Sequence, residues 1–433
     1  MKPTIKLSED QLEAVKTIFE LLEDEDYVTL SGSAGTGKTT TAHAIYRMAR
    51  KKGYNCFLTA PTNKAAKVLS DKTGEKAITI HKMLRLILED FEDTQQLIQA
   101  GAPQFEYGEK IFVIIDEASM LGEELMSIVH EMVEENDHVR ILFIGDPYQL
   151  NPVNEEESAA FDYGGYELKK VLRQQENNPI IMMAQDLRHM QMRDPQAKLR
   201  WSTYVDNDMV RIIPRYKEFL EAYLEDYEAG LDSHIVCWRN STVIDTNNFV
   251  REQLYGDESV KPFIVGEKLM TYAPVIEDDG KKKTIVLDNS EIVEIYDIAQ
   301  DTTIICGEEF LYYLLTVEAD DGRLVKINIP LDQLSVDNYL KRIVAKAKKL
   351  TGTMRSGVFR DEFFPVKNFF GNVRHAHAIT SHKSQGSTYD SVYVNVQDIS
   401  FNPLYLEKLR SLYVAVTRTS NRLYLYGCRE RGL

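Results

Sequence analysis

The sequence predicts an α/β protein with two parallel sheets and a small β-barrel inserted into its second part. Three observations predict this fold. Apolar β-type runs alternate with helical patterns from 27 to 146, the alternation starts again at 234 and resumes after 375, and short β-type segments fill 288–335. Alternating strands and helices indicate a parallel sheet that binds ligands at the carboxyl ends of its strands. Consecutive short strands with turn signals indicate a barrel.

The predicted elements follow in order. The first helix is expected over 7–22, "LSEDQLEAVKTIFELL", because its apolar residues recur at helical spacing and Ser8 with Gln11 forms a capping-box start. The run "YVTLSG" (27–32) predicts a strand that feeds a helix over 39–53. Further strands are expected at 56–62, 111–119 and 139–146 in the first part, and within 234–254, 375–396 and 422–427 in the second.

Composition and charge restrict the function classes. The chain has 433 residues, of which 43% are hydrophobic and 27% charged, as in folded multidomain proteins. Its formal net charge of −16 argues against a protein that coats nucleic acid nonspecifically, although a local basic groove is still compatible with it. Within 336–383 the balance reverses, which indicates either such a groove or an ordinary solvated helix face. The basic residues there are Lys341, Arg342, Lys346, Lys348, Lys349, Arg355, Arg360, Lys367, Arg374 and Lys383.

Cysteines and apolar runs give expectations about location. The four cysteines show no C-x-x-C spacing, so neither a disulfide framework nor a zinc site is predicted, and we interpret them as buried thiols. The start "MKPTIKLSEDQ" lacks the pattern of a signal peptide, and no apolar run approaches the length of a membrane span. A cytoplasmic protein without a membrane partner is expected.

The segment "SGSAGTGKTT" (31–40) contains the phosphate-loop pattern G-x-x-x-x-G-K-[ST]. The glycines Gly32, Gly35 and Gly37 allow successive backbone N–H groups to point at phosphates, and the following helix adds its positive N-terminus. Lys38 is expected to reach the β- and γ-phosphates of ATP. Thr39 is expected to hold Mg²⁺, and Thr40 completes the nucleotide-binding segment.

Two more strand ends carry polar residues that suit the same chemistry. Asp116 and Glu117 end the apolar run "IFVIIDEAS", where adjacent acids are costly unless a cation faces them. We expect Asp116 to hold Mg²⁺ and Glu117 to orient and deprotonate the attacking water. In "GDPYQLNPV" (145–153), Gln149 either senses the γ-phosphate or belongs to a Pro-bounded turn, and the sequence favours neither interpretation.

Taken together and in this order, the motifs resemble the superfamily 1 DNA helicases, most closely the Dda-like and RecD-like branch. They extend from near residue 7 to near residue 427, and only 85–110 and 288–373 match weakly. The motifs are "LSEDQ" (7–11), "GSAGTGKTT" (32–40), "APTNKAA" (60–66), "TIHKML" (79–84), "DEAS" (116–119), "GDPYQLNPV" (145–153), "LKKVLRQ" (168–174), "TSHKSQGSTYD" (380–390) and "LYVAVTRTSNRLYLYG" (412–427).

The resemblance implies two RecA-like lobes that clamp ATP between them. It places the first lobe at 1–84 and 111–231, with a pin-type insertion at 85–110. The second lobe then covers 232–287 and 374–433, and an SH3-like barrel with a basic extension covers 288–373. Phe105 or Tyr107 is the candidate wedge of the pin by its aromatic character, although an aromatic residue there can equally serve packing.

The resemblance also implies residue roles. Gln11 would read the adenine, although the capping box explains it equally well. Arg173 and Arg418 would reach the γ-phosphate from the two lobes, and Gln385 with Gly386 would couple the DNA site to the nucleotide. The residues expected to hold the DNA backbone are Pro61, Thr62, Asn63, His81, Thr380, His382 and Lys383. The alternative is that they have purely structural roles, as a Pro-containing turn and an ordinary helix cap.

The expected function is an ATP- and Mg²⁺-dependent DNA helicase that moves along single-stranded DNA and opens duplex forks. Travel from 5′ to 3′ rests on the resemblance alone. The expected setting is the cytoplasm of a bacterial or phage-infected cell, with a monomeric protein and replication or single-strand-binding proteins as partners. Two alternatives are a DNA-stimulated ATPase that binds single strands without separating duplexes and a phosphate-loop kinase acting on a small molecule.

Overall fold

The computed structural model describes residues 7–91, 94–99, 102–106, 108–152, 158–170, 178–192, 199–206, 208–278, 283–319 and 321–428. The chain divides into two compact units. The first contains residues 1–85, 102–246 and 378–433, and the second contains residues 86–101 and 247–377. Among the described residues, no helix combines the length and the apolar character needed to cross a membrane.

The first unit contains a six-stranded parallel sheet with the order β3-β2-β6-β7-β1-β8. The strands that the sequence predicts at 27–32, 56–62, 111–119 and 139–146 are all present in this sheet, each within a few residues of the expected bounds. Their bounds are β1 Tyr27–Gly32, β2 Asn55–Ala60, β3 Ala77–Thr79, β6 Ile111–Ile115, β7 Val139–Gly145 and β8 Gly165–Leu168.

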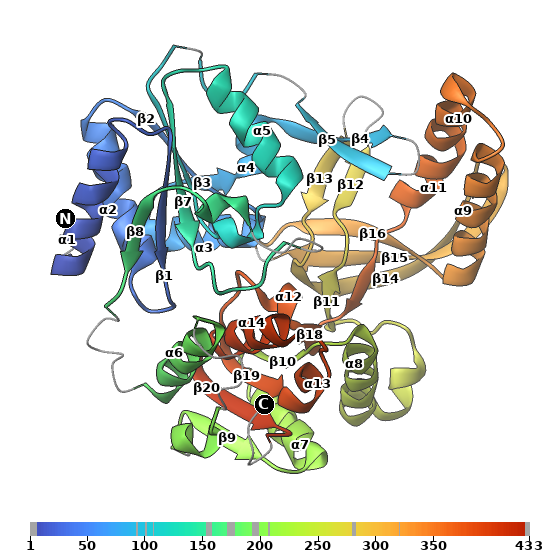
Figure 1. Ribbon diagram of the computed structural model, residues 1–433. Coiled ribbons are helices and arrows are strands. Elements are labelled where there is room, and N and C mark those ends of the chain that lie inside the picture. The colour runs from blue at the N-terminus through green and yellow to red at the C-terminus, as the bar shows by residue number, and fades with distance from the viewer. Residues whose placement is uncertain are drawn as a thin grey trace. The chain divides into compact units, whose positions relative to one another are not determined.

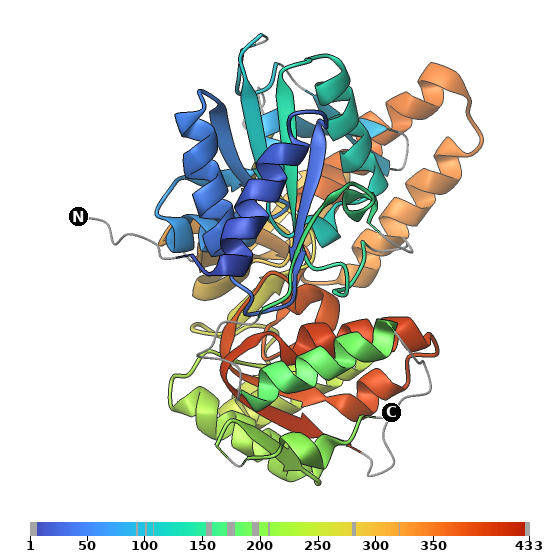
Figure 2. The same ribbon diagram turned by 60° about the vertical axis from the view of Figure 1, so that its left-hand side comes forward.

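Helices cover both faces of this sheet. Figures 1 and 2 show α1 and α2 on one face and α5 on the other. The core on the first of these faces is apolar and closed to solvent, and Ile18 of α1, Ile45 of α2 and Leu30 of β1 are all 0% exposed within it. The helices are α1 Glu9–Leu21, α2 Lys38–Lys51, α3 Asn63–Thr73, α4 Ile80–Leu84 and α5 Glu123–Glu134, and a 3₁₀ turn η1 covers Ala118–Met120.

The same unit contains a second, five-stranded parallel sheet with the order β18-β10-β19-β20-β9. Helices α6 and α14 lie side by side on it, as Figure 2 shows, and α7 packs against β10, β19 and β20. The strands are β9 Val210–Ile213, β10 Ser233–Cys237, β18 Ala378–Thr380, β19 Tyr389–Asn395 and β20 Thr419–Tyr426. The helices are α6 Pro179–Met192, α7 Tyr216–Glu228, α12 Ser381–Ser384, α13 Val396–Ser400 and α14 Tyr405–Val416.

The expected boundary between the lobes at residue 231 differs from the structure. Strand β9 pairs with β20 of the second sheet, so the chain has left the first sheet well before residue 210. The reason is that β9 is only four residues long and forms the edge of its sheet. A short edge strand carries no periodic signal that would assign it to one sheet or the other.

The second unit is built on an antiparallel sheet with the order β16-β15-β14-β11-β17. The run of β-type segments predicted at 288–335 corresponds to β14, β15 and β16, but the sheet also takes in β11 and β17, which the sequence analysis places in or beside the second lobe. The strands of this sheet are β11 Lys268–Thr271, β14 Ile292–Ile305, β15 Glu308–Ala319, β16 Leu324–Pro330 and β17 Val373–His375.

Two hairpins and a group of helices complete the second unit. The hairpin β4–β5 falls within the expected pin-type insertion, but it groups with this unit and not with the first sheet. The helices pack on Phe310 of β15 through a largely aromatic core. The elements are β4 Leu86–Phe91, β5 Thr94–Gln99, β12 Val275–Asp278, β13 Lys283–Leu287, α9 Gln333–Ala347, α10 Gly352–Val358, the π-helical turn η6 Phe359–Phe363 and α11 Phe364–Phe369; α8 Asn240–Tyr255 links the two units.

The close approach of β8 to β1 gives a prediction for stability. A Cβ atom on Gly165 would lie 2.1 Å from the carbonyl oxygen of Thr29, whereas a Cβ on the neighbouring Gly164 would meet nothing within 4 Å. Gly165→Ala is expected to lower the free energy of unfolding by about 1–3 kcal/mol, because β8 must move away from β1. Gly164→Ala is expected to change it by less than about 0.5 kcal/mol. Urea unfolding of both variants, followed by circular dichroism, measures the difference, and equal losses would contradict the packing described.

Candidate functional site

The phosphate loop connects β1 to α2 and depends on its glycines. Gly35 and Gly37 have φ angles of 82° and 83°, a region that other residues rarely adopt. Gly32 has no room for a side chain, because a Cβ there would lie 2.8 Å from Thr36 Oγ1 and 3.1 Å from Leu168 Cβ. The glycines of the motif are therefore required for two different reasons, backbone conformation and close packing against β8.

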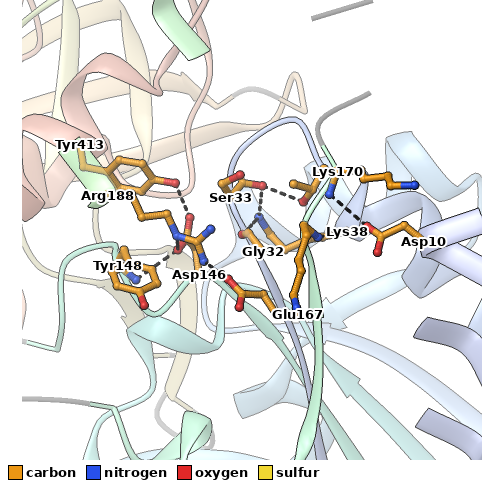
Figure 3. Close-up of polar contacts among 12 residues, drawn as sticks. Asp10, Gly32, Ser33, Lys38, Asp146, Tyr148, Glu167, Lys170, Arg188 and Tyr413 are labelled. Carbon is orange, nitrogen blue, oxygen red and sulfur yellow. Dashed lines mark hydrogen bonds and ion pairs between the residues drawn. The ribbon is translucent and has the colours of Figure 1, made fainter. Parts of the chain in front are cut away.

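Lys38 opens helix α2 and turns its side chain back over the loop. Its Nζ donates to the carbonyl oxygens of Gly32, at 2.7 Å, and Ser33, at 3.1 Å (Figure 3). Thr39 and Thr40 follow it in the first turn of α2. The ammonium group and the N-terminus of the helix thus lie together, an arrangement that suits a phosphate.

Gln11 forms the capping box and also contacts the phosphate loop, while its role in reading the adenine stays a prediction. Ser8 and Gln11 form the reciprocal capping box at the start of α1, with distances of 3.3 Å and 2.9 Å. The Nε2 group of Gln11 also donates to the carbonyl oxygen of Gly37, at 3.4 Å, and the residue is 3% exposed. The capping interpretation is confirmed, and the same side chain touches the phosphate loop.

The acid pair follows β6. The backbone N–H of Glu117 donates to Asp116 Oδ1 at 3.0 Å, and Glu117 itself has a φ angle of 52°, unusual for a residue with a side chain. Burial and the neighbouring charge of Glu117 raise the pKa of Asp116 to about 6, against the opposing effects of the Glu117 backbone, Lys38 and Lys72. A desolvated carboxylate that lacks sufficient positive charge fits a divalent cation, and the oxygens of Asp116 and Thr39 are ligands that Mg²⁺ accepts.

The segment after β7 is contacted from the second sheet by Gln385, which directly follows α12. The Nε2 group of Gln385 lies 3.4 Å from Gln149 Oε1, 3.3 Å from Ser119 Oγ and 3.3 Å from the carbonyl oxygen of Leu150. Gln149 is 4% exposed. One amide therefore reaches both the acid-pair segment and the segment after β7.

Asp146 is a buried acid that the sequence analysis missed. It is 0% exposed, and its Oδ1 accepts from the backbone N–H of Tyr148 at 3.1 Å. The Tyr413 hydroxyl donates to Oδ2, and Arg188 Nε lies 4.0 Å from Oδ1 (Figure 3). An acid directly after the apolar run 139–145 was a usable signal for Asp146, whereas Tyr413 lies within the apolar segment 412–416, which is typical of a core helix.

A second acid missed by the sequence analysis is Asp10 in the first turn of α1. Its Oδ2 accepts from the backbone N–H groups of Lys169 and Lys170 at 3.0 and 3.1 Å, and its Oδ1 accepts from the Tyr166 hydroxyl at 3.0 Å (Figure 3). These bonds attach α1 to β8, the strand beside the phosphate loop. Asp10 therefore has a structural role at the edge of the site.

The two arginines expected at the γ-phosphate have different outcomes. Arg173 lies outside the described residues. Arg418 is 6% exposed, and its guanidinium donates to the carbonyl oxygens of Val414 and Ser387, at 3.1 and 3.3 Å, and to Thr417 Oγ1 at 3.0 Å. All three partners belong to the second-sheet part of the chain, at the end of α14 and before β19.

The candidate DNA residues lie at the carboxyl ends of strands. Thr62 after β2 and Thr380 of β18 cap the helices that follow, accepting from the backbone N–H groups of Ala65 and Lys383 at 3.2 and 3.3 Å. Pro61 and Asn63 flank Thr62. The helix-cap interpretation is therefore confirmed for both threonines.

The histidines and Gly386 complete this group. His81 lies in α4, whose cap is Thr79. Burial lowers the pKa of His382, and the charge of Glu407 opposes that shift. Gly386 has a φ angle of 72°, and a Cβ atom there would lie 4.0 Å from Ala65 Cβ of α3. The first turn of α3 and the segment after α12 are thus neighbours.

The two candidate wedge residues and most of the basic stretch belong to the weakly matched regions of the chain. Phe105 is 7% exposed and packs against the ring of Phe57, with centroids 6.2 Å apart, so the packing alternative describes it and the wedge role does not. Tyr107 lies outside the described residues. In the basic stretch, Arg342 pairs with Glu308 and Lys346 with Glu362, both at 2.5 Å, so acidic partners offset part of its charge.

Family models and curated relatives match the sequence of this chain. The family model for an AAA domain matches residues 6–214, and that for a UvrD-like helicase C-terminal domain matches residues 375–426. The ATP-dependent DNA helicase dda of Enterobacteria phage T4 is 27% identical over 95% of this chain and 97% of its own length. The ATP-dependent RecD2 DNA helicase of Deinococcus radiodurans is 33% identical over 42% of this chain and 24% of its own length.

Solved structures show the same fold. A Pif1 helicase structure, described as the basis for unwinding of forked duplex DNA by two coordinating Pif1 helicases, aligns with a TM-score of 0.51 and 20% identity, covering 97% of this chain and 92% of that one. The Pif1 helicase from Candida albicans aligns with a TM-score of 0.50 and 18% identity, covering 99% and 95%. With the phosphate loop and the acid pair, the family models and the curated relatives support a superfamily 1 helicase similar to the Dda- and Pif1-type proteins.

Proposed function

We propose that this protein is an ATP-driven DNA helicase that moves along single-stranded DNA from 5′ to 3′ and separates duplex DNA at forks. The observation that carries the proposal is the position of Gln385. Its amide contacts the segments after β6 and β7, and it follows directly on the candidate DNA residues Thr380, His382 and Lys383. A displacement of the DNA-binding segment is thereby transmitted to residues beside the nucleotide.

The geometry supports a hydrolytic mechanism at the phosphate loop. The loop amides and Lys38 bind the phosphates, and Thr39 with Asp116 would hold Mg²⁺, which would neutralise charge on the β- and γ-phosphates. Glu117 accepts a proton from water as the water oxygen bonds to the γ-phosphorus and the bond to the bridging oxygen breaks. Gln149 orients the γ-phosphate, and Arg418 with Arg173 stabilises the developing negative charge.

DNA is bound through its backbone. Pro61, Thr62 and Asn63 with His81 line one sheet, and Thr380, His382 and Lys383 line the other, all at strand ends. Hydroxyl and N–H donors at these positions recognise phosphates without reading bases. We further propose that the protein acts as a monomer inside a bacterial or phage-infected cell, where single-strand-binding or replication proteins share its substrate.

The substrate test measures ATP hydrolysis and fork unwinding side by side on 5′-tailed, 3′-tailed and RNA-tailed substrates. We expect DNA-stimulated hydrolysis together with unwinding of the 5′-tailed DNA fork. Hydrolysis that ignores DNA would instead indicate a small-molecule kinase, and stimulated hydrolysis without unwinding would indicate a translocase that does not separate strands. Unwinding only from 3′ tails would reverse the polarity proposed here.

Lys38 and Glu117 are expected to be separable by substitution. Lys38→Ala removes the charge that neutralises the phosphates and should weaken ATP binding. Glu117→Gln keeps the side-chain shape but removes the base, so turnover should fall by roughly 10²–10⁴-fold while ATP still binds. Both variants should lose unwinding. Near-normal turnover of Glu117→Gln in the presence of DNA would contradict the role assigned to the carboxylate.

Arg418→Ala is expected to lower DNA-stimulated turnover by roughly 10³–10⁵-fold, because it removes charge stabilisation in the transition state. Nucleotide affinity should change much less, since Lys38 and the phosphate loop belong to the first sheet. Arg422→Ala is the matched control, an exposed arginine on β20 that pairs with Asp226 at 3.8 Å. A loss of affinity in step with rate, or equal effects of the two substitutions, would rule out the proposed role of Arg418.

A further inference from the structure

A junction of three side chains joins the two parallel sheets beside the phosphate loop. Asp146 follows β7 of the first sheet, Tyr413 lies on α14, and Arg188 lies on α6 (Figure 3). Asp146 and Tyr413 are both 0% exposed. A carboxylate removed from water in this way requires donors or positive charge nearby. Here a hydroxyl comes from α14, which packs on β19, and a guanidinium comes from α6, which packs on α14.

Tyr413 also lies near the phosphate loop. The backbone of Ala34, in the loop between β1 and α2, partly offsets the rise in the pKa of Tyr413. The hydroxyl is held as a donor to Asp146, because burial and the Asp146 charge raise the pKa of Tyr413 well above its usual value. The hydroxyl of Tyr413 on α14 therefore holds the segment that leads to Gln149, next to the phosphate loop.

Arg188 supports the same junction from the side. Its Nη2 donates to Glu167 Oε1 at 2.5 Å, and its guanidinium lies 4.4 Å from the ring centroid of Tyr148. Glu167 on β8 is the register partner of Ser31, one residue before Gly32. The arginine thus connects Asp146 to the strand that packs beside the start of the phosphate loop.

We propose that Tyr413 is a positioning residue for ATP hydrolysis, which sets the Gln149 segment in register with the second sheet through its hydrogen bond to Asp146. The inference rests on the proposed ATPase function and extends it to a residue outside the groups that contact the nucleotide. The hydroxyl does not take part in bond making. Its effect passes through the geometry of Gln149, and misplacement of reacting groups by about 1 Å can cost on the order of 10²-fold in rate.

The test is Tyr413→Phe, which removes only the hydroxyl, assayed for DNA-stimulated ATP hydrolysis and for binding of a non-hydrolysable ATP analogue. We expect kcat to fall by roughly ten- to a hundredfold, with analogue affinity changed by less than about threefold, because Lys38 and the loop amides remain. Asp146→Asn should lower kcat in the same way. The double variant should lose little more than the worse single variant, since both act through one contact.

Tyr393→Phe is the matched control. Tyr393 is another fully buried tyrosine of the second sheet, and its hydroxyl donates to Asp226 Oδ2 at 2.9 Å and to the carbonyl oxygen of Ala222 at 2.7 Å, within the second sheet and its helix α7. Tyr393→Phe should lower the midpoint temperature of unfolding as Tyr413→Phe does, but it should leave kcat unchanged. If Tyr413→Phe lowers only the midpoint, or if the single losses in kcat add in the double variant, the positioning role is overturned. A wild-type protein without DNA-stimulated turnover would instead overturn the proposed function.

Discussion

A carboxylate withdrawn from water must be neutralised, and this requirement organises the carboxyl end of the first sheet. Asp116 and Asp146 directly follow the neighbouring parallel strands β6 and β7; Asp146 is fully buried and Asp116 is half-buried. Asp146 accepts from the backbone N–H of Tyr148 and from the Tyr413 hydroxyl of α14, and Arg188 of α6 lies 4.0 Å from it. Asp116 has Lys38 nearby but keeps a raised pKa, so its site still favours added positive charge. Asp146 thus joins the first sheet to α14, whereas Asp116 remains available to bind a cation.

This division explains why the phosphate loop is not an isolated motif. The loop packs on β8 through Gly32 and contacts Gln11 of α1 through the carbonyl oxygen of Gly37. Each contact comes from a different part of the chain. Hydrogen bonds connect the second sheet to the segments around the phosphate loop. Tyr413 bonds to Asp146, and Gln385 contacts Ser119 and Gln149.

Local sequence patterns were sufficient for the features that depend on local physics. The capping box of α1, four of the six strands of the first sheet and the glycine loop follow from periodicity and backbone freedom, and all are present. The short strand β9 was assigned to the wrong sheet, because membership of a sheet is decided by distant partners such as β20. Tyr413 was missed for a related reason. From the sequence alone, a tyrosine in an apolar segment is predicted to be a core residue. Its partner Asp146 lies 267 positions away in the chain, so only the fold shows the hydrogen bond.

Under the proposed function, the threonine caps have a consequence for how a nucleic acid would be recognised. Thr62, Thr79 and Thr380 each use the hydroxyl oxygen as an acceptor for a helix N–H, which leaves the hydroxyl proton as the group to offer outward. A proton donor of this kind prefers an anionic oxygen and is indifferent to the base attached beyond it. Under the proposed function, strands whose backbone has been made neutral, such as those with methylphosphonate linkages, would lose this contact while keeping every base, so the caps would distinguish a charged backbone from an uncharged one.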